Sequence, residues 1–415
     1  MKRLAVSPDG RRLITADGER IYLIGDTAWE LFHRLDDRET DLYLATRAEQ
    51  GFNLIQAVAL PELEGLRVPD RQGMLPLTDW DPTRPNPRYF DRLARIIAAA
   101  AERGLYLGLL PTWGDKFNRL WGAGPEIFNP DNAFIYGRFL GERLGGFDNL
   151  IWILGGDRPL TQPRHHAVID GLARGLRAGD GGKCLITYHP WGKTSSSAFV
   201  GDREWIDFHM LQSGHSDPRP PSYELIRADY LRHPPKPVMD GEPCYEDHPI
   251  DFDPNRGYYD GVDTRLAAWR NLLSGACGHT YGHHAVWQMN RTPTPYCPND
   301  WQGALHRPGA ECIRHYRRFL EDNDLTSLRP VYDPVADNRS GALYVAALAG
   351  EEKAVLYLPT GGPVTLHLPF TPAACRVFEP ATGEYHRRVL LTGDRLILPG
   401  RPAGRGMDAV VILER

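Results

Sequence analysis

Residues 149–160, NLIWILGGDRPL, begin as an uninterrupted apolar run and end in two glycines, an aspartate, an arginine and a proline. An apolar run of this length without polar alternation is typical of a strand that is buried on both faces, as in a parallel sheet covered by helices. Glycines at a strand end let the backbone turn and leave room for a ligand. The stretch therefore predicts a buried parallel strand that presents Asp157 at its carboxyl end.

Seven other segments repeat this pattern along the first 284 residues. The eight predicted strands are 21–26, 52–60, 105–113, 150–157, 184–190, 205–212, 237–243 and 277–284. Segments with helical apolar spacing and glycine stops lie between them, at 38–51, 86–104, 129–146 and 263–275. Eight such repeats favour an α/β fold of the (β/α)8 TIM barrel type, whereas an open doubly wound sheet is the alternative and lacks its dinucleotide glycine fingerprint here.

The pattern changes to short alternating runs near residue 326. Such runs, separated by Gly and Pro turns, predict strands at 342–349, 353–359, 364–369, 375–380, 395–399 and 409–414. We therefore expect two domains, a catalytic barrel over residues 1–325 and a small C-terminal antiparallel β-sandwich over 326–415.

Composition excludes several classes of protein. A net charge of −5 and a hydrophobic fraction of 42% describe an ordinary globular chain, so we expect neither a nucleic-acid partner nor a membrane. The six cysteines lack C-x-x-C spacing, which predicts reduced thiols and no zinc cage, and nothing in the sequence indicates a cofactor. No apolar run near the start resembles a signal peptide, which predicts a cytoplasmic protein, or a secreted one if a signal was removed. The oligomeric state stays open.

Two carboxylates stand out among the polar residues at the predicted strand ends. Asp157 on strand four and Glu242 on strand seven each follow a glycine and closely precede a proline. The carboxyl ends of barrel strands carry the chemistry in this fold, and strands four and seven lie nearly opposite each other across the barrel. The long connections 61–85 and 296–311 are expected to cover this face. The competing interpretations are a helix N-cap for Asp157 and an ion pair with a barrel lysine or arginine for Glu242.

Such a pair is what glycoside hydrolysis requires, because one carboxylic acid protonates the leaving oxygen and a carboxylate attacks the anomeric carbon or activates water. Tryptophans near strand ends or in the long loops could stack on sugar rings. These are Trp29, Trp113, Trp121, Trp191, Trp287 and Trp301. The residues expected to bind substrate are Asp26, Trp29, Asn53, Gln56, Trp113, Lys116, His189, His209, Tyr281 and Trp287. Tyr281 is expected to orient Glu242, and Asp26 has a turn cap as its alternative role.

The sequence also resembles a known family. The stretches LIGDTAWELFHRL (23–35), GFNLIQAVAL (51–60), PNPRYFDRLARII (85–97), GLYLGLLPTWGDK (104–116), NLIWILGGDRP (149–159), PVMDGEPCYE (237–246) and YGHHAVWQM (281–289) are similar to those of the apiosidase-like glycosidases, glycoside hydrolase family 140. The resemblance covers about residues 5–415. It implies a retaining enzyme of the clan A barrel type, with Asp157 of GGD as acid/base and Glu242 of DGEP as nucleophile. The implied activity is removal of a β-linked apiose side chain from pectic rhamnogalacturonan II.

Two other functions compete with this interpretation. A metal-dependent barrel hydrolase would use histidines near strand ends, for which His189, His209, His279 and His283 are the candidates, although the metal-ligand pattern on the early strands is poor. A non-catalytic carbohydrate-binding barrel protein would retain the fold without turnover. The first interpretation requires a bound metal ion, and the second requires no cofactor.

Overall fold

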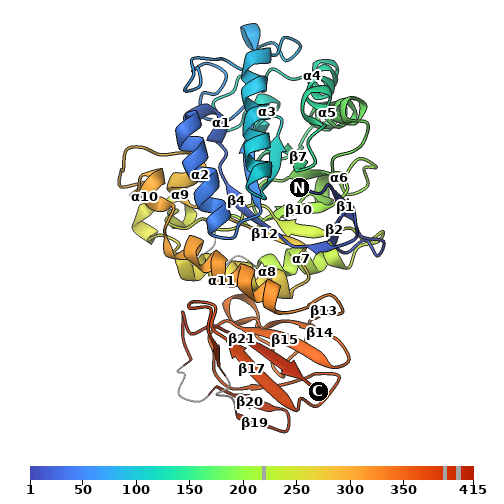
Figure 1. Cartoon of the computed structure of the whole chain (residues 1–415), viewed down its shortest axis with the longest axis vertical. Helices are drawn as coiled ribbons and strands as arrows, with labels where there is room; N and C mark the ends of the chain where they lie inside the picture. Colours follow the sequence, from blue (N-terminus) through green and yellow to red (C-terminus); the bar gives the residue numbers. More distant parts are fainter. Residues whose placement is uncertain (217–220, 387–389, 399–402) are drawn as a thin grey trace.

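The computed structural model describes residues 1–216, 221–386, 390–398 and 403–415 of the chain. Figure 1 shows a barrel of strands surrounded by helices, with a separate group of antiparallel strands packed below it. The order of the chain matches its arrangement in space, because the colours run from blue to orange through the barrel and its helices and reach red in the lower domain.

Eight parallel strands form the barrel, as the alternating sequence pattern predicts. They are β4 (Leu23–Thr27), β5 (Leu54–Val58), β6 (Tyr106–Leu110), β7 (Leu150–Gly155), β8 (Ile186–His189), β10 (His209–Gln212), β11 (Val238–Asp240) and β12 (Gly278–Tyr281). Each pairs with its neighbour in chain order from β4 to β8 and from β10 to β12, and β12 pairs with β4. Between β8 and β10 the backbone N–H of Asp207 donates to Ile186 O at 2.9 Å and Thr187 Oγ1 donates to Phe208 O at 2.7 Å. The eight strands therefore surround one centre.

Helices cover the outside of this sheet. They are α1 (Leu31–Arg34), α2 (Asp37–Glu49), α3 (Pro87–Glu102), α4 (Pro130–Leu144), α5 (Pro163–Asp180), α6 (Ser197–Val200), α7 (Ser222–Tyr230), α8 (Gly261–Leu273), α9 (His284–Trp287), α10 (Trp301–Ala304) and α11 (Pro308–Asp322). Capping boxes start α2, α4 and α8 at Asp36, Asn129 and Asp260, which is why these helices begin close to the predicted positions. No helix within the described residues combines the length and apolarity that a membrane crossing requires.

The first predicted strand, 21–26, divides into two elements. Arg20–Ile21 forms β3 in a small antiparallel sheet with β1 (Leu4–Val6) and β2 (Leu13–Thr15), and the barrel strand β4 begins two residues later. The predicted connection 296–311 is also less irregular than expected, since it contains α10 and the start of α11. A further two-residue strand, β9 (Thr194–Ser195), pairs antiparallel with β10.

Apolar side chains pack in two layers around the barrel strands. Inside the barrel, a cluster that includes Leu54, Tyr106, Ile153, Met210 and Met239 fills the centre. A larger cluster lies between the strands and the helices, as expected when strand residues alternate between two buried faces. The filled interior leaves the ends of the barrel as the places where ligands can bind.

The C-terminal region consists of two antiparallel sheets that share an apolar core, as predicted for a β-sandwich. The larger sheet contains β13 (Arg329–Val331), β14 (Ala346–Ala349), β15 (Lys353–Leu358), β21 (Ala409–Glu414), β17 (Ala374–Phe378) and β18 (Tyr385–His386). The smaller contains β16 (Val364–Thr365), β20 (Arg395–Ile397) and β19 (Leu390–Thr392). The last residue of the predicted strand 395–399 lies outside the described residues.

The sandwich packs against α8 of the barrel. Trp269 of α8 lies with its ring centroid 6.3 Å from that of Tyr357 and 5.6 Å from that of Phe378. Beside them, Arg265 donates to Asp408 through Nη2 at 2.7 Å and through Nε at 3.0 Å, and both side chains are buried. The contact between barrel and sandwich therefore combines a buried aromatic core with a buried ion pair.

Candidate active site

A cavity of about 550 Å³ lies at the carboxyl ends of the barrel strands. Asp157 and Glu242 both line it, as do Trp29, Trp113, Trp121, Trp191 and Trp287. The rest of its wall includes Glu62, Lys193, Gln212, His215, Tyr245, His248 and Phe252. The combination of two carboxylates with aromatic faces suits a ligand that has both hydroxyl groups and apolar C–H faces.

The backbone after β7 turns sharply to present Asp157. Gly155 and Gly156 have φ values of 92° and 108°, and Asp157 itself lies in the left-handed region at 51°. A Cβ on Gly155 would lie 2.4 Å from His189 O, and one on Gly156 would lie 2.8 Å from Gly114 N. Both glycines are therefore required by conformation and by space. A left-handed aspartate costs conformational energy, which is a feature that clusters at functional sites.

Asp157 does not cap the following helix. Helix α5 begins at Pro163, and its N-cap position is Gln162. The N-cap interpretation of Asp157 is therefore wrong, because five residues separate it from the start of the helix. Its carboxyl instead borders the cavity with its side chain 23% exposed.

Two histidines hold the carboxylate of Glu242. His215 Nε2 lies 2.9 Å from Oε1, and His189 Nε2 lies 3.0 Å from Oε2. In each ring the other nitrogen faces a backbone donor, since Nδ1 of His189 accepts from Asp157 N–H and Nδ1 of His215 accepts from Tyr245 N–H, both at 3.4 Å. This pattern places the ring proton on Nε2, where it faces Glu242. The partners of Glu242 are histidines, so the competing interpretation of an ion pair with a lysine or arginine is wrong.

The two carboxyl groups are driven toward opposite protonation states. Burial and then the charge of Glu242 raise the pKa of Asp157 to about 7. Burial would also raise the pKa of Glu242, but the hydrogen bonds from His189 and His215 outweigh it and lower that pKa to about 2. Near neutral pH the cavity therefore holds one carboxylate and one carboxyl group that can carry a proton. Such a pair is suited to acid/base work beside a nucleophile.

Several predicted substrate residues meet in this cavity. Trp29, Trp113 and Trp287 line it, and His189 lies behind Asp157 and Glu242. The ring of Trp29 lies 5.1 Å from that of Trp113 and 5.4 Å from that of His189. Trp121 and Trp191 complete the aromatic wall, whereas Trp301 is buried in the core between strands and helices.

Three other predicted residues do not line the cavity. Asp26 accepts from Arg47 Nε and from Tyr43 OH, both at 2.6 Å, in a fully buried pair. Lys116 is buried against Asp115, with Nζ 2.8 Å from both carboxylate oxygens. Gln56 donates to Gly241 O at 2.8 Å and so supports the backbone next to Glu242.

Tyr281 does not orient Glu242. Its hydroxyl donates to Glu246 Oε2 at 2.7 Å, and the same oxygen accepts Gly309 N–H at 2.9 Å. The reason is that Tyr281 ends β12 facing the outer helices, where it packs in the outer apolar cluster. The tyrosine that lines the cavity is Tyr245.

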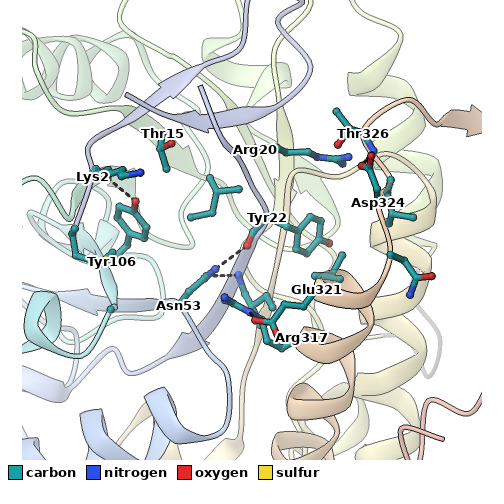
Figure 2. Close-up of a pocket in the computed structure, with 17 residues that line it drawn as sticks. Lys2, Thr15, Arg20, Tyr22, Asn53, Tyr106, Arg317, Glu321, Asp324 and Thr326 are labelled. Carbon is teal, nitrogen blue, oxygen red and sulfur yellow. Dashed lines mark hydrogen bonds and ion pairs between the residues drawn. The ribbon is translucent and has the colours of Figure 1, made fainter. Parts of the chain in front are cut away.

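Asn53 and His209 lie at the starts of their strands rather than at the ends. Asn53 precedes β5, accepts Ile24 N–H at 2.7 Å and donates to Tyr22 O at 2.9 Å. Figure 2 shows it in a second cavity, of about 520 Å³, at the amino ends of the strands, together with Arg20, Tyr106 and Arg317. His209 is the first residue of β10, and its Nδ1 lies 3.1 Å from Ser196 Oγ. Neither side chain lines the cavity that contains the two carboxylates.

The sequence reasoning missed Glu62, His215, Tyr245, His248 and Phe252. His215 follows β10 through Gly214, whose φ is 79°, so it repeats the pattern of a strand, a glycine and a polar residue that identified Asp157 and Glu242. The other four lie on long connections, where no periodicity marks them. Within the described ranges, no group of three or more His, Cys, Asp or Glu side chains is arranged to hold a metal ion.

Comparisons with known proteins agree with this geometry. A crystal structure of a glycoside hydrolase family 5 protein from Bacteroides vulgatus is similar, with 27% identity, a TM-score of 0.89, and coverage of 99% of this chain and 93% of that chain. A structure described as a glycoside hydrolase is 26% identical, with a TM-score of 0.89 and coverage of 100% and 97%. A family 5 mannosidase from Rhizomucor miehei shares the fold at 13% identity and a TM-score of 0.56, over 77% of this chain and 98% of that chain.

No curated protein matches the chain. The family model for the apiosidase-like catalytic domain matches residues 7–327, which include the whole barrel and both cavity carboxylates. This match and the two full-length structural relatives give the class of enzyme. The chain belongs to the family of apiosidase-like catalytic domains and is a glycoside hydrolase.

Proposed function

We propose that the chain is a retaining glycoside hydrolase in which Glu242 is the nucleophile and Asp157 is the acid/base. The observation that carries this assignment is the opposite pKa shift of two carboxyl groups on one cavity, to about 2 for Glu242 and to about 7 for Asp157. A nucleophile must be ionised and a general acid must hold a proton at the same pH. The histidines on Glu242 support the first condition, and the burial of Asp157 together with the charge of Glu242 supports the second.

The reaction follows the double-displacement scheme. In the first step a Glu242 oxygen forms a bond to the anomeric carbon while the glycosidic C–O bond breaks and Asp157 transfers its proton to the leaving oxygen. In the second step Asp157, now a carboxylate, takes a proton from water, whose oxygen replaces Glu242 at the anomeric carbon. Each carboxyl group ends the cycle in its starting state. His189 and His215 limit the motion of Glu242 so that the same oxygen can attack and leave.

The substrate is assigned from the family and from the shape of the site. We take it to be a plant-derived pectic oligosaccharide, with an apiose residue as the sugar that is removed. The support is the apiosidase-like family match together with a wall of five tryptophans, whose faces complement sugar rings. The cavity of about 550 Å³ is within the ordinary range for a small-molecule site.

The test combines a substrate screen with a stereochemical measurement. Release of reducing sugar from pectic oligosaccharides with and without apiose identifies the substrate, and release of apiose from the former is the expected result. ¹H NMR of the first product then shows whether the anomeric configuration is kept. An inverted product would overturn the nucleophile assignment. Binding without any turnover would make the chain a carbohydrate-binding barrel, and turnover that a chelator abolishes would favour metal-dependent hydrolysis.

A further inference from the structure

We propose that Arg158 and Glu62 form a positioning pair for Asp157, in which Arg158 holds one carboxyl oxygen and Glu62 offsets the charge of the guanidinium. This inference rests on the proposed function, because it assigns to the pair the task of keeping the acid/base in place and able to carry its proton. Neither residue is a proton donor or a nucleophile in the scheme. Both act through Asp157.

Arg158 is fully buried next to the acid/base, and its guanidinium touches Asp157 twice. Nη1 donates to the backbone oxygen of Asp157 at 2.8 Å and lies 3.3 Å from Oδ2. For Oδ1 the described residues show no partner, so Oδ1 is the oxygen that is free to face the glycosidic bond. A guanidinium is rigid and always charged, which makes it an effective anchor for a carboxyl group held in a left-handed turn.

Glu62 binds the other side of the same guanidinium. Its Oε1 accepts from Arg158 Nη2 at 2.5 Å, and its side chain is 20% exposed at the cavity wall. Trp121 covers the pair, since Arg158 Cζ lies 4.3 Å from the centroid of its ring. Gly114 and Gly122 leave room for the Arg158 side chain. A Cβ on Gly114 would lie 2.6 Å from Arg158 Cγ, and one on Gly122 would lie 2.7 Å from Arg158 Nη2. The contact is therefore built by three separate connections, those after β5, β6 and β7.

The charges around Asp157 explain why an arginine here needs a partner. Burial is the largest cause that raises the pKa of Asp157, and Glu242, on the connection after β11, raises it further. Arg158 and His189 lower this pKa, and Glu62 raises it. Burial raises the pKa of Glu62, which Arg158 and Lys116 lower and Asp115 raises. An unpaired guanidinium within contact distance of an aspartate would favour the ionised form, in which Asp157 could not donate a proton. Glu62 opposes that effect while leaving the hydrogen bonds of Arg158 in place.

The experiment is a carboxyl titration, which needs no substrate. Protein labelled with [γ-¹³C]aspartate is titrated by NMR, and the Asp157 signal is the one that Asp157→Asn removes. The wild-type midpoint is expected near 7. Glu62→Gln should lower it by about one pH unit, because the charge of Arg158 is no longer offset. Arg158→Gln should raise it, and by more than Glu62→Gln lowers it, because Arg158 affects the pKa of Asp157 more strongly than Glu62 does.

The matched control is Glu64→Gln, which removes a carboxylate from the same connection. Glu64 pairs with Arg67 on the surface and does not line the cavity, so its removal should leave the midpoint unchanged. An unchanged midpoint in folded Glu62→Gln would overturn the inference, and this variant suffices if Arg158→Gln does not fold. Failure of the proposed function would be a separate result. In that case Asp157→Asn would keep wild-type turnover, even if Glu62→Gln shifts the titration midpoint of Asp157.

Discussion

Nε2 of His189 lies 3.0 Å from Oε2 of Glu242, and Nδ1 of the same ring accepts the backbone N–H of Asp157 at 3.4 Å. One imidazole therefore touches the residue proposed as nucleophile and the turn that carries the proposed acid/base. With His215 Nε2 2.9 Å from Oε1, each oxygen of the carboxylate has one histidine nitrogen within about 3 Å. The site is therefore organised around an ionised Glu242.

Glu242→Gln removes the nucleophile and keeps the size of the side chain. We expect kcat to fall on the order of 10⁴-fold or more, because the variant lacks the carboxylate that forms the glycosyl-enzyme in the proposed scheme. Initial rates of sugar release measure the loss. Circular dichroism and oligosaccharide binding should stay close to wild type. A variant that keeps substantial turnover would show that another group attacks the anomeric carbon.

Asp157→Asn removes the proton that the leaving group requires. A loss of roughly 10² to 10⁴-fold in kcat is expected for natural glycosides, since this is the usual contribution of general acid catalysis. In wild type, kcat/KM should decline as pH rises through about 7, where Asp157 loses its proton. The pH profile of the variant should lack this alkaline decline. If the decline persists, a different group controls it.

His215→Ala removes the hydrogen bond between His215 Nε2 and Glu242 Oε1. Because the bond from His215 Nε2 to Oε1 helps to lower the pKa of Glu242, the acidic limb of the kcat/KM profile should move upward from about 2 toward the ordinary glutamate value. The rate at neutral pH should also fall, since the carboxylate loses an orienting contact. His306→Ala is the control, because His306 is exposed and pairs with Glu311. An acidic limb that stays in place would contradict the role of His215.

Asp408→Ala tests how the sandwich is joined to the barrel. The substitution leaves Arg265 buried without its carboxylate, so the free energy of unfolding should fall by about 3 to 5 kcal/mol. Denaturant unfolding measures the change. Glu351→Ala on the exposed turn between β14 and β15 should have little effect. A small loss in Asp408→Ala would show that the Arg265–Asp408 pair contributes little to joining the sandwich to the barrel.

The fold could be predicted from the sequence because its signals are local. Apolar runs such as 150–155, each ending at a glycine or a polar residue, predict buried parallel strands wherever they occur, and eight of them form the barrel. The same rule identified Asp157 and Glu242, because barrel chemistry lies at the carboxyl ends of strands. The same rule applies to His215, which follows β10 through Gly214.

Other assignments failed where position within a strand, or contact across the barrel, decided the outcome. Asn53 and His209 lie at the amino ends of β5 and β10, away from the cavity, although the predicted strands 52–60 and 205–212 contain them. Glu62 and Tyr245 reach the cavity from connections that carry no periodic pattern. Sequence by itself determined which strands form and which carboxylates they present. Only the closed barrel decided which histidines bind Glu242 and that Glu62 pairs with Arg158, because those contacts join segments that no local spacing relates.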